Sequence, residues 1–153
     1  MKTIKSFQVN HNYIKEGLYV SRMDGDITTY DIRTRRPNMG DYMDNITMHS
    51  VEHMIATYAR NGKYGENVIY FGPMGCRTGF YLLTRGLTNE QALELLTDAL
   101  ERTVAHEGEV FGATREQCGN YRELSLDAAK CECERFLAVL RSEPVTFSYP
   151  EES

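Results

Sequence analysis

The sequence predicts an α+β fold, with a mainly antiparallel sheet packed with helices. Strand-like segments come early in the chain with helical segments interspersed, and they lack the regular β-α-β alternation that a parallel sheet requires. The chain has 153 residues, of which 41% are hydrophobic and 25% charged, so it can bury a full core without disulfides or a structural metal. We therefore expect residues 1–153 to form one domain.

A β-hairpin between Gly17 and Arg33 is the first expected element. Residues 18–20 and 27–32 are rich in strand-forming side chains, and Asp24-Gly25-Asp26 between them supplies the turn.

The first long helix should begin near Asn45 or Thr47 and end before Asn61-Gly62, a typical C-terminal stop. It carries an apolar stripe at helical spacing, formed by Met48, Val51, Ile55 and Tyr58. The helix can therefore pack on one side and present polar side chains on the other.

Two further strands are expected at residues 68–71 and 80–83, and the glycine-rich run 72–79 between them reads as a loop or bulge. Thr88 and Gln91 form a capping box for a helix that ends near Glu107-Gly108, and Ser125 caps a last helix that runs through Leu140. The inward faces of these two helices should hold Ala92, Leu95, Leu96, Ala99, Leu100 and Val104, and then Ala128, Phe136, Leu137 and Leu140.

Charge and cysteine content exclude several functional classes. The net charge of −5 argues against a general nucleic-acid binder, and we find no apolar run long enough to span a membrane and no apolar leader after Met1. The four cysteines show no disulfide framework, so we expect a reducing, cytoplasmic location in which thiols serve as ligands or catalysts.

The run His49-Ser50-Val51-Glu52-His53 is the most informative motif in the chain. On a helix, His53 lies roughly 40° from His49 and Glu52 roughly 60° to the other side, so all three side chains share one arc. Two imidazoles on adjacent turns can bind one divalent metal, with the carboxylate beside it to move a proton. The same order occurs in inverse-motif zinc peptidases.

A catalytic metal site normally has three protein ligands, and the third here could be Cys118, His11, His106 or a carboxylate. Cys118 lies in a polar, glycine-flanked run between two helices, unlike a cysteine that merely fills a core. A thiolate ligand would suit Zn²⁺ or Fe²⁺ and disfavour Mg²⁺ or Ca²⁺.

Cys76 lies in a glycine-rich run beside Arg77, whose charge favours a thiolate, and the alternative is a buried cysteine in a tight turn. Cys131 and Cys133 look like a metal clip. Residues two apart on a helix point in nearly opposite directions, so we interpret this pair as structural.

Taken in order, these motifs resemble the S-ribosylhomocysteine lyases (LuxS), which make the precursor of the autoinducer-2 signal. The resemblance covers nearly the whole chain. It is carried by Ser6-Phe7, His11-Asn12, Asp31-Ile32-Arg33 with Pro37-Asn38, His49-Ser50-Val51-Glu52-His53, Pro73-Met74-Gly75-Cys76-Arg77-Thr78-Gly79-Phe80-Tyr81 and Gln117-Cys118-Gly119.

The resemblance implies a homodimer with active sites at the subunit interface and one divalent metal per subunit, natively Fe²⁺, with Zn²⁺ or Co²⁺ as substitutes. It implies the cleavage of S-ribosylhomocysteine to homocysteine and 4,5-dihydroxy-2,3-pentanedione. The implied metal ligands are His49, His53 and Cys118, the acid/base pair is Glu52 and Cys76, and the substrate pocket is lined by Ser6, His11 and Arg33.

Two runs depart from the family pattern. Thr34-Arg35-Arg36 stands where the family often has a cysteine after its arginine, and Tyr70-Phe71-Gly72 replaces a common Asp-Ile-Ser. The second change replaces a family aspartate near the substrate with Tyr70.

Two other functions compete with this interpretation. An inverse-motif zinc peptidase would use a glutamate as third ligand and generally a much larger chain. A small metal-binding module without catalysis would leave Glu52 and Cys76 without a role.

Overall fold

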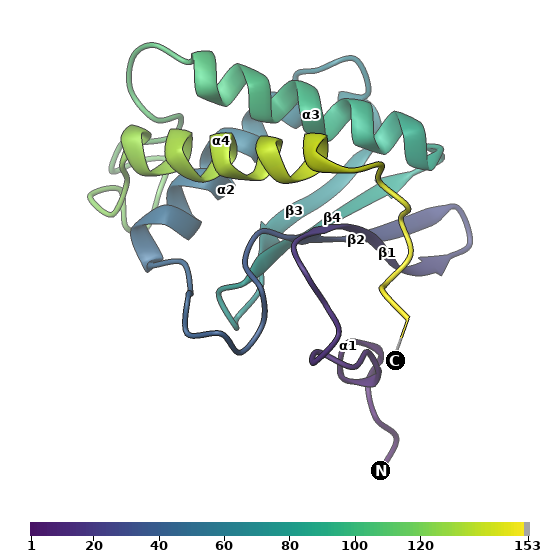
Figure 1. The fold of residues 1–153 in the computed structure, drawn as a ribbon. Coiled ribbons are helices and arrows are strands. Elements are labelled where there is room, and N and C mark those ends of the chain that lie inside the picture. Colours follow the sequence, from purple (N-terminus) through teal and green to yellow (C-terminus); the bar gives the residue numbers. More distant parts are fainter. Residues whose placement is uncertain (152–153) are drawn as a thin grey trace.

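Four strands form one antiparallel sheet in the computed structural model, which describes residues 1–151 (Figure 1). The strand order is β1-β2-β4-β3, and every neighbouring pair is antiparallel. The strands are β1 (Gly17–Asp24), β2 (Ile27–Arg33), β3 (Val68–Pro73) and β4 (Gly79–Arg85). The predicted α+β class with an antiparallel sheet is therefore confirmed.

Three long helices lie together on one face of this sheet, as Figure 1 shows. They are α2 (Asn45–Arg60), α3 (Asn89–Ala105) and α4 (Leu126–Ser142). The 3₁₀ helix η1 (Gly65–Asn67) leads into β3, and the short helix α1 (Lys5–Gln8) lies on the opposite side of the sheet. Within residues 1–151, no helix is long and apolar enough to cross a membrane.

Strand alternation divides the side chains of β2 between two environments. Tyr30 and Ile32 join the core beneath the helices, where Phe71 and Phe80 stack with ring centroids 5.1 Å apart. Asp31 and Arg33 point to the other face, and both are buried there. The fold therefore places an ion pair on the side of the sheet that the three helices leave uncovered.

The C-terminal segment returns along β1 and partly covers this second face. The backbone N–H of Val20 donates to the carbonyl of Phe147 at 2.8 Å, and Tyr19 forms a parallel bridge with Phe147. The yellow segment in Figure 1 follows this course from the end of α4 past β1.

Most of the predicted local signals are confirmed. Gly25 turns the hairpin with a φ of +63°, the Thr88–Gln91 capping box forms, and Ser125 caps α4. Asp44, which was not predicted to have a role, caps α2 by accepting a hydrogen bond from the N–H of Thr47 at 2.7 Å.

Several boundaries and one core position were wrong. Residues 72, 73 and 79 belong to strands, so the loop is only 74–78. A Cβ at Gly72 would overlap the ring of Tyr70, which folds back over the glycine and would have to move aside. Helix α3 ends at Ala105 rather than near 107, helix α1 was not predicted, and Ala129 rather than the half-buried Ala128 is the fully buried alanine of α4.

Candidate metal centre

Helix α2 places the two motif histidines side by side on adjacent turns. Their rings lie 4.6 Å apart between centroids and are nearly perpendicular, at 88°. The helix is fixed at its first turn by the Asp44 cap and further along by Ser50, whose hydroxyl accepts the backbone N–H of Ser125 at 2.8 Å. This second bond joins the start of α4 to the helix that carries the histidines.

Cys118 completes a cluster of three candidate ligands. Its Sγ lies 3.3 Å from Nε2 of His49, and the ligand atoms of His49, His53 and Cys118 all lie within 4.8 Å of one another. The loop before Cys118 is folded by Thr114, whose carbonyl accepts the N–H groups of both Gln117 and Cys118. Two nitrogens and one thiolate in this arrangement are typical of Zn²⁺ or Fe²⁺ sites.

Backbone carbonyls select the tautomer of both histidines. Nδ1 of His53 lies 2.7 Å from the carbonyl oxygen of Phe111, and Nδ1 of His49 lies 3.1 Å from that of Glu123. Because a carbonyl can only accept, each Nδ1 carries the proton and each Nε2 is left with its lone pair for a metal. The Glu123 carboxylate adds a second acceptor 3.4 Å from Nδ1 of His49.

The sulfur also has a backbone partner. The N–H of Asn120 donates to Sγ of Cys118 at 3.4 Å, which helps to hold the sulfur in place. The donor set, the tautomers and this contact therefore all fit a bound divalent cation.

The loop 106–112 holds the Phe111 carbonyl in place. Gly112 has a φ of +71°, and a Cβ there would lie 3.0 Å from Nδ1 of His53. His106 fixes the other end, because its Nδ1 accepts the hydroxyl of Tyr58 at 2.7 Å and its Nε2 donates to the carbonyl of Glu109 at 2.8 Å.

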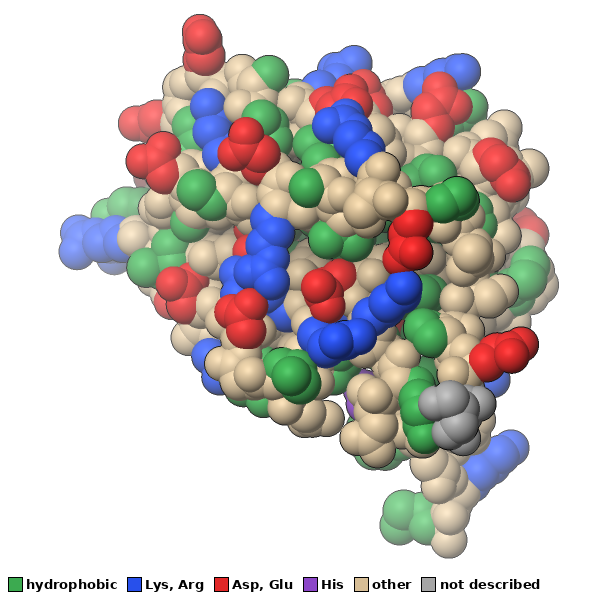
Figure 2. Space-filling model, in the orientation of Figure 1, with side chains coloured by type: hydrophobic (Ala, Val, Ile, Leu, Met, Phe, Trp, Pro, Cys, Tyr) green, Lys and Arg blue, Asp and Glu red, His purple; other side chains and the backbone are tan. Residues whose placement is uncertain are grey.

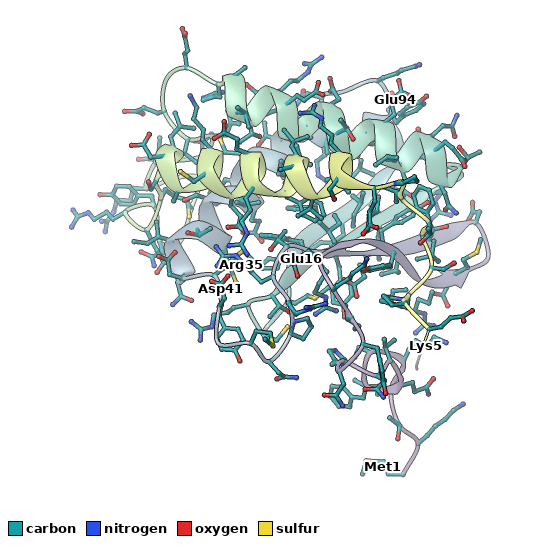
Figure 3. The ribbon with its side chains drawn as sticks, in the orientation of Figure 1. Met1, Lys5, Glu16, Arg35, Asp41 and Glu94 are labelled. Atoms are coloured by element: carbon teal, nitrogen blue, oxygen red, sulfur yellow. The ribbon has the colours of Figure 1, made fainter. Side chains whose placement is uncertain are left out.

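The other candidate third ligands lie elsewhere. In the described part of the chain, neither His106 nor His11 joins the three-residue cluster. Nδ1 of His11 lies 2.9 Å from the carbonyl of Val9, and Ser6 lies on α1. In Figure 3 this N-terminal segment, with Met1 and Lys5 labelled, projects away from the helix layer.

Glu52 is half-buried on α2, beside His53 in the sequence. Among residues 1–151, no side chain or backbone group forms a hydrogen bond or ion pair with its carboxylate. A carboxylate without fixed partners, next to a metal site, is free to accept and return a proton.

Cys76 lies in a second cluster, on the loop between β3 and β4. Its exposed Sγ lies 3.0 Å from Oγ1 of Thr78 and 3.9 Å from Nη1 of Arg33, and the same Nη1 donates to Thr78 at 2.8 Å. Arg33 also forms two hydrogen bonds to Asp31, at 2.6 and 3.1 Å. The alternative of a buried cysteine in a tight turn is therefore wrong.

Burial and charge set the electrostatics of this second cluster. Burial by itself would lower the pKa of Arg33, but the Asp31 carboxylate raises it above its ordinary value, so the guanidinium stays charged. Burial, and then Asp31, raise the pKa of the Tyr81 phenol. Arg33 thus places a charged guanidinium near Cys76, and the Asp31 carboxylate balances its charge from the other side.

Sequence reasoning missed the partners of both clusters. Phe111 and Glu123 act through backbone carbonyls, which leave no side-chain signal. Thr78 and Asp31 lie within the quoted motifs, and their nearness to Arg33 could have been suggested from there.

Cys131 is exposed and Cys133 is buried, as opposite directions on one helix require.

The chain is similar to known proteins over most of its length. The chain matches the model of the S-ribosylhomocysteinase (LuxS) family over residues 4–145. It is 44% identical over 143 residues to the S-ribosylhomocysteine lyase of Clostridium beijerinckii, covering 90% of each chain. It is 43% identical over 158 aligned positions to that of Clostridium acetobutylicum, covering 99% of this chain and 100% of the relative. A protein of the same name from Finegoldia magna is 40% identical over the same shares.

Proposed function

The chain belongs to the S-ribosylhomocysteinase (LuxS) family, and we propose that it is a metal-dependent lyase acting through the two clusters described above. It is an S-ribosylhomocysteine lyase, an enzyme that breaks a carbon–sulfur bond. The proposed products are homocysteine and 4,5-dihydroxy-2,3-pentanedione. The cluster of His49, His53 and Cys118 beside an unpaired Glu52 carries the proposal.

These three side chains would hold the cation, which we propose to be Fe²⁺, with Zn²⁺ or Co²⁺ as substitutes. The mixed imidazole and thiolate donors support a transition metal of this kind. When bound, the cation would supply Lewis acidity to the carbonyl and hydroxyl oxygens of the sugar. The carbonyl partners of both Nδ1 atoms support this assignment because they keep the Nε2 atoms unprotonated.

The remaining chemistry is proton transfer. The thioether of the substrate lies too far from the aldehyde for direct elimination, so the carbonyl must first move along the sugar by two aldose-ketose isomerisations. Each needs a base at carbon and an acid at oxygen, and the thioether then leaves by β-elimination. We assign these transfers to Glu52 and Cys76, with Cys76 as a proton carrier rather than a covalent nucleophile.

Ser6, His11 and Arg33 are proposed to line the substrate pocket. Arg33 is 3% exposed and engaged with Asp31 and Thr78, so its proposed contribution is the positive charge beneath Cys76. Ser6 and His11 lie on the N-terminal segment, where a neighbouring subunit can approach them.

The positions of the two clusters support a homodimer with interfacial active sites. The metal ligands belong to the helix layer, and Cys76 is not among the ligand atoms grouped within 4.8 Å in the described chain. The helices cover one face of the sheet only, and the edge strand β3 exposes Tyr70 and Ile69 at 49% and 37%. A second copy packed on this face would bury them and bring Cys76 to a partner's metal ligands.

We propose a cytoplasmic location, which the four free cysteines support. Acidic and basic side chains are interspersed over the face in Figure 2, without a continuous basic stripe, which fits a small-molecule substrate rather than nucleic acid.

A thiol-detection assay on protein purified anaerobically, with Fe²⁺ content measured alongside, tests the activity. Wild type should release homocysteine. Glu52→Gln should keep its metal and lose at least about 100-fold in kcat. Glu134→Gln, at an exposed carboxylate of α4, is the matched control and should resemble wild type. Unchanged turnover in Glu52→Gln, or loss of metal from it, would refute the base assignment.

Subunit exchange tests the interfacial site. Glu52→Gln and Cys76→Ala should each be inactive, and their mixture should regain activity, because one of the two sites in a mixed dimer is then intact. A mixture that stays inactive, or a monomer by light scattering, would refute this part of the proposal.

A further inference from the structure

The C-terminal segment ends on the sheet face that the helices leave uncovered. Beyond the Val20–Phe147 hydrogen bond, Tyr149 stacks on Tyr19 with ring centroids 4.9 Å apart and an interplanar angle of 26°. The family match ends at residue 145, so Tyr149 lies outside it. The ring is held by β1, and its hydroxyl points into the buried ion pair of β2.

That hydroxyl is the third hydrogen-bond donor to the Asp31 carboxylate. It donates to Oδ2 at 2.8 Å, the same oxygen that Nη2 of Arg33 contacts at 2.6 Å, while Nε of Arg33 contacts Oδ1 at 3.1 Å. Asp31 is only 2% exposed, so water does not replace a lost donor easily.

The third nitrogen of Arg33 reaches the Cys76 cluster. Nη1 donates to Thr78 Oγ1 at 2.8 Å and lies 3.9 Å from Sγ of Cys76. A continuous path of hydrogen bonds therefore runs from the tail through Asp31 and Arg33 to the loop that carries the thiol.

We propose that Tyr149 is a positioning residue for Cys76, which it influences by fixing the Asp31–Arg33 pair. The proposal rests on the proposed function for the catalytic role of Cys76, whereas the hydrogen bonds that link Tyr149 to Cys76 do not depend on it. The Tyr149 hydroxyl and the Arg33 guanidinium both donate hydrogen bonds to the Asp31 carboxylate and so partly balance its negative charge. With the hydroxyl removed, Asp31 is balanced by Arg33 alone, and less of the positive field reaches the sulfur.

The hydroxyl of Tyr149 stays a donor over the working pH range. Burial, and then the neighbouring Asp31 charge, raise the pKa of this phenol far above its ordinary value. The other groups that face the sulfur or neighbour it are Arg33, the phenol of Tyr81 and Arg77. Tyr149→Phe substitutes none of these side chains, and the Tyr149 hydroxyl reaches them through the Asp31 carboxylate, so a shift in thiol reactivity reports on the path through Asp31.

Tyr149→Phe is the test, because it removes the hydroxyl and keeps the stacked ring. Tyr64→Phe is the matched control, since the Tyr64 hydroxyl also donates to a carboxylate, that of Glu94 on α3, at 3.1 Å. The metal-loaded full chain is treated with iodoacetamide from pH 5 to 10, and alkylation of Cys76 is followed by mass spectrometry of its peptide.

We expect Cys76 to be alkylated about 3- to 10-fold more slowly in Tyr149→Phe than in wild type at pH 7. The midpoint of the plot of alkylation rate against pH should move to higher pH. Its kcat should fall in parallel with KM little changed, and Tyr64→Phe should follow wild type in both measurements. Superimposable alkylation profiles for Tyr149→Phe and wild type would overturn the proposal. If the wild-type chain has no lyase activity, the proposed function is contradicted. The alkylation profiles of wild type and Tyr149→Phe would still decide whether Tyr149 influences Cys76.

Discussion

Gly112 offers the sharpest test of how the backbone holds the candidate metal ligands. Its φ of +71° lies in the left-handed region, where a side chain costs roughly 1–2 kcal/mol. In Gly112→Ala the new Cβ would also lie 3.0 Å from Nδ1 and 3.3 Å from Cε1 of His53. Both distances are shorter than the ordinary contact of about 3.5 Å, so the ring must move by a few tenths of an ångström.

That movement acts on the bond that orients the ligand. His53 donates to the Phe111 carbonyl at 2.7 Å, and loss of such a partner typically costs about 10- to 100-fold in metal affinity, or about 1.4–2.8 kcal/mol. Gly108→Ala is the matched control. Gly108 has a φ of +101°, and a Cβ added there would meet no atom within 4 Å, so it shares the strain and lacks the contact.

Co²⁺ titration followed by visible absorption, in competition with a chelator, measures the affinity, and urea unfolding of the metal-free protein measures the strain. Both variants should lose about 1 kcal/mol of unfolding free energy, whereas Gly112→Ala alone should bind Co²⁺ about 10- to 100-fold more weakly. Equal affinity in the two variants would refute the reasoning that the Phe111–Gly112 backbone orients His53.

Three further predictions concern stability. Burial, and then Glu132, raise the pKa of the Cys133 thiol from 9.0 to about 12, so this group stabilises the fold fully below pH 9 and loses that contribution as pH rises towards 12. Cys133→Ala should flatten the alkaline fall in unfolding free energy, and an unchanged slope in urea titrations would contradict this. Glu132→Gln should cost about 3 kcal/mol because it breaks the buried pair with Arg35, which has bonds of 2.6 and 3.0 Å; a loss below about 1 kcal/mol in urea unfolding would count against it. Thr88→Ala removes the capping hydroxyl from the N–H of Gln91 and should cost about 1 kcal/mol in thermal unfolding, with Thr88→Ser as the conservative control that restores most of it.

The parts of the fold that the sequence predicted depend on short-range signals. The hairpin turn at Gly25 and the caps at Thr88 and Ser125 are decided by residues within three positions of each other. The prediction of a loop over residues 72–79 was wrong at both ends, because glycine also occurs in strands where another group lies close. A Cβ at Gly79 would overlap the carbonyl of Ile32, and one at Gly72 the ring of Tyr70.

The candidate site likewise has residues that short-range spacing predicts and residues that it does not. His49 and His53 follow from their spacing on one helix, but Cys118 is 65 residues after His53 and was assigned only through resemblance to a family. The groups that orient the ligands were beyond reach, because Phe111 and Glu123 contribute backbone carbonyls whose position depends on loop geometry. Arg35, beside Asp41 in Figure 3, also binds Glu132, which lies 97 residues further along the chain, so this contact is likewise tertiary.

The Asp31–Arg33 pair connects the packing of the core with the chemistry of the loop. A slip of one residue in the pairing of β2 would exchange the two faces of the strand, placing Asp31 and Arg33 under the helices and Tyr30 and Ile32 outside. Burying a charged pair without its present partners costs several kcal/mol, and exposing the two apolar side chains adds to that cost. The apolar pattern that fixes the register of β2 therefore also fixes the face on which Arg33 meets Cys76. A substitution at Asp31 should consequently disturb thiol reactivity and also destabilise the fold, because it leaves Arg33 buried without its carboxylate, whereas the loss of one hydroxyl at Tyr149 should act mainly on thiol reactivity.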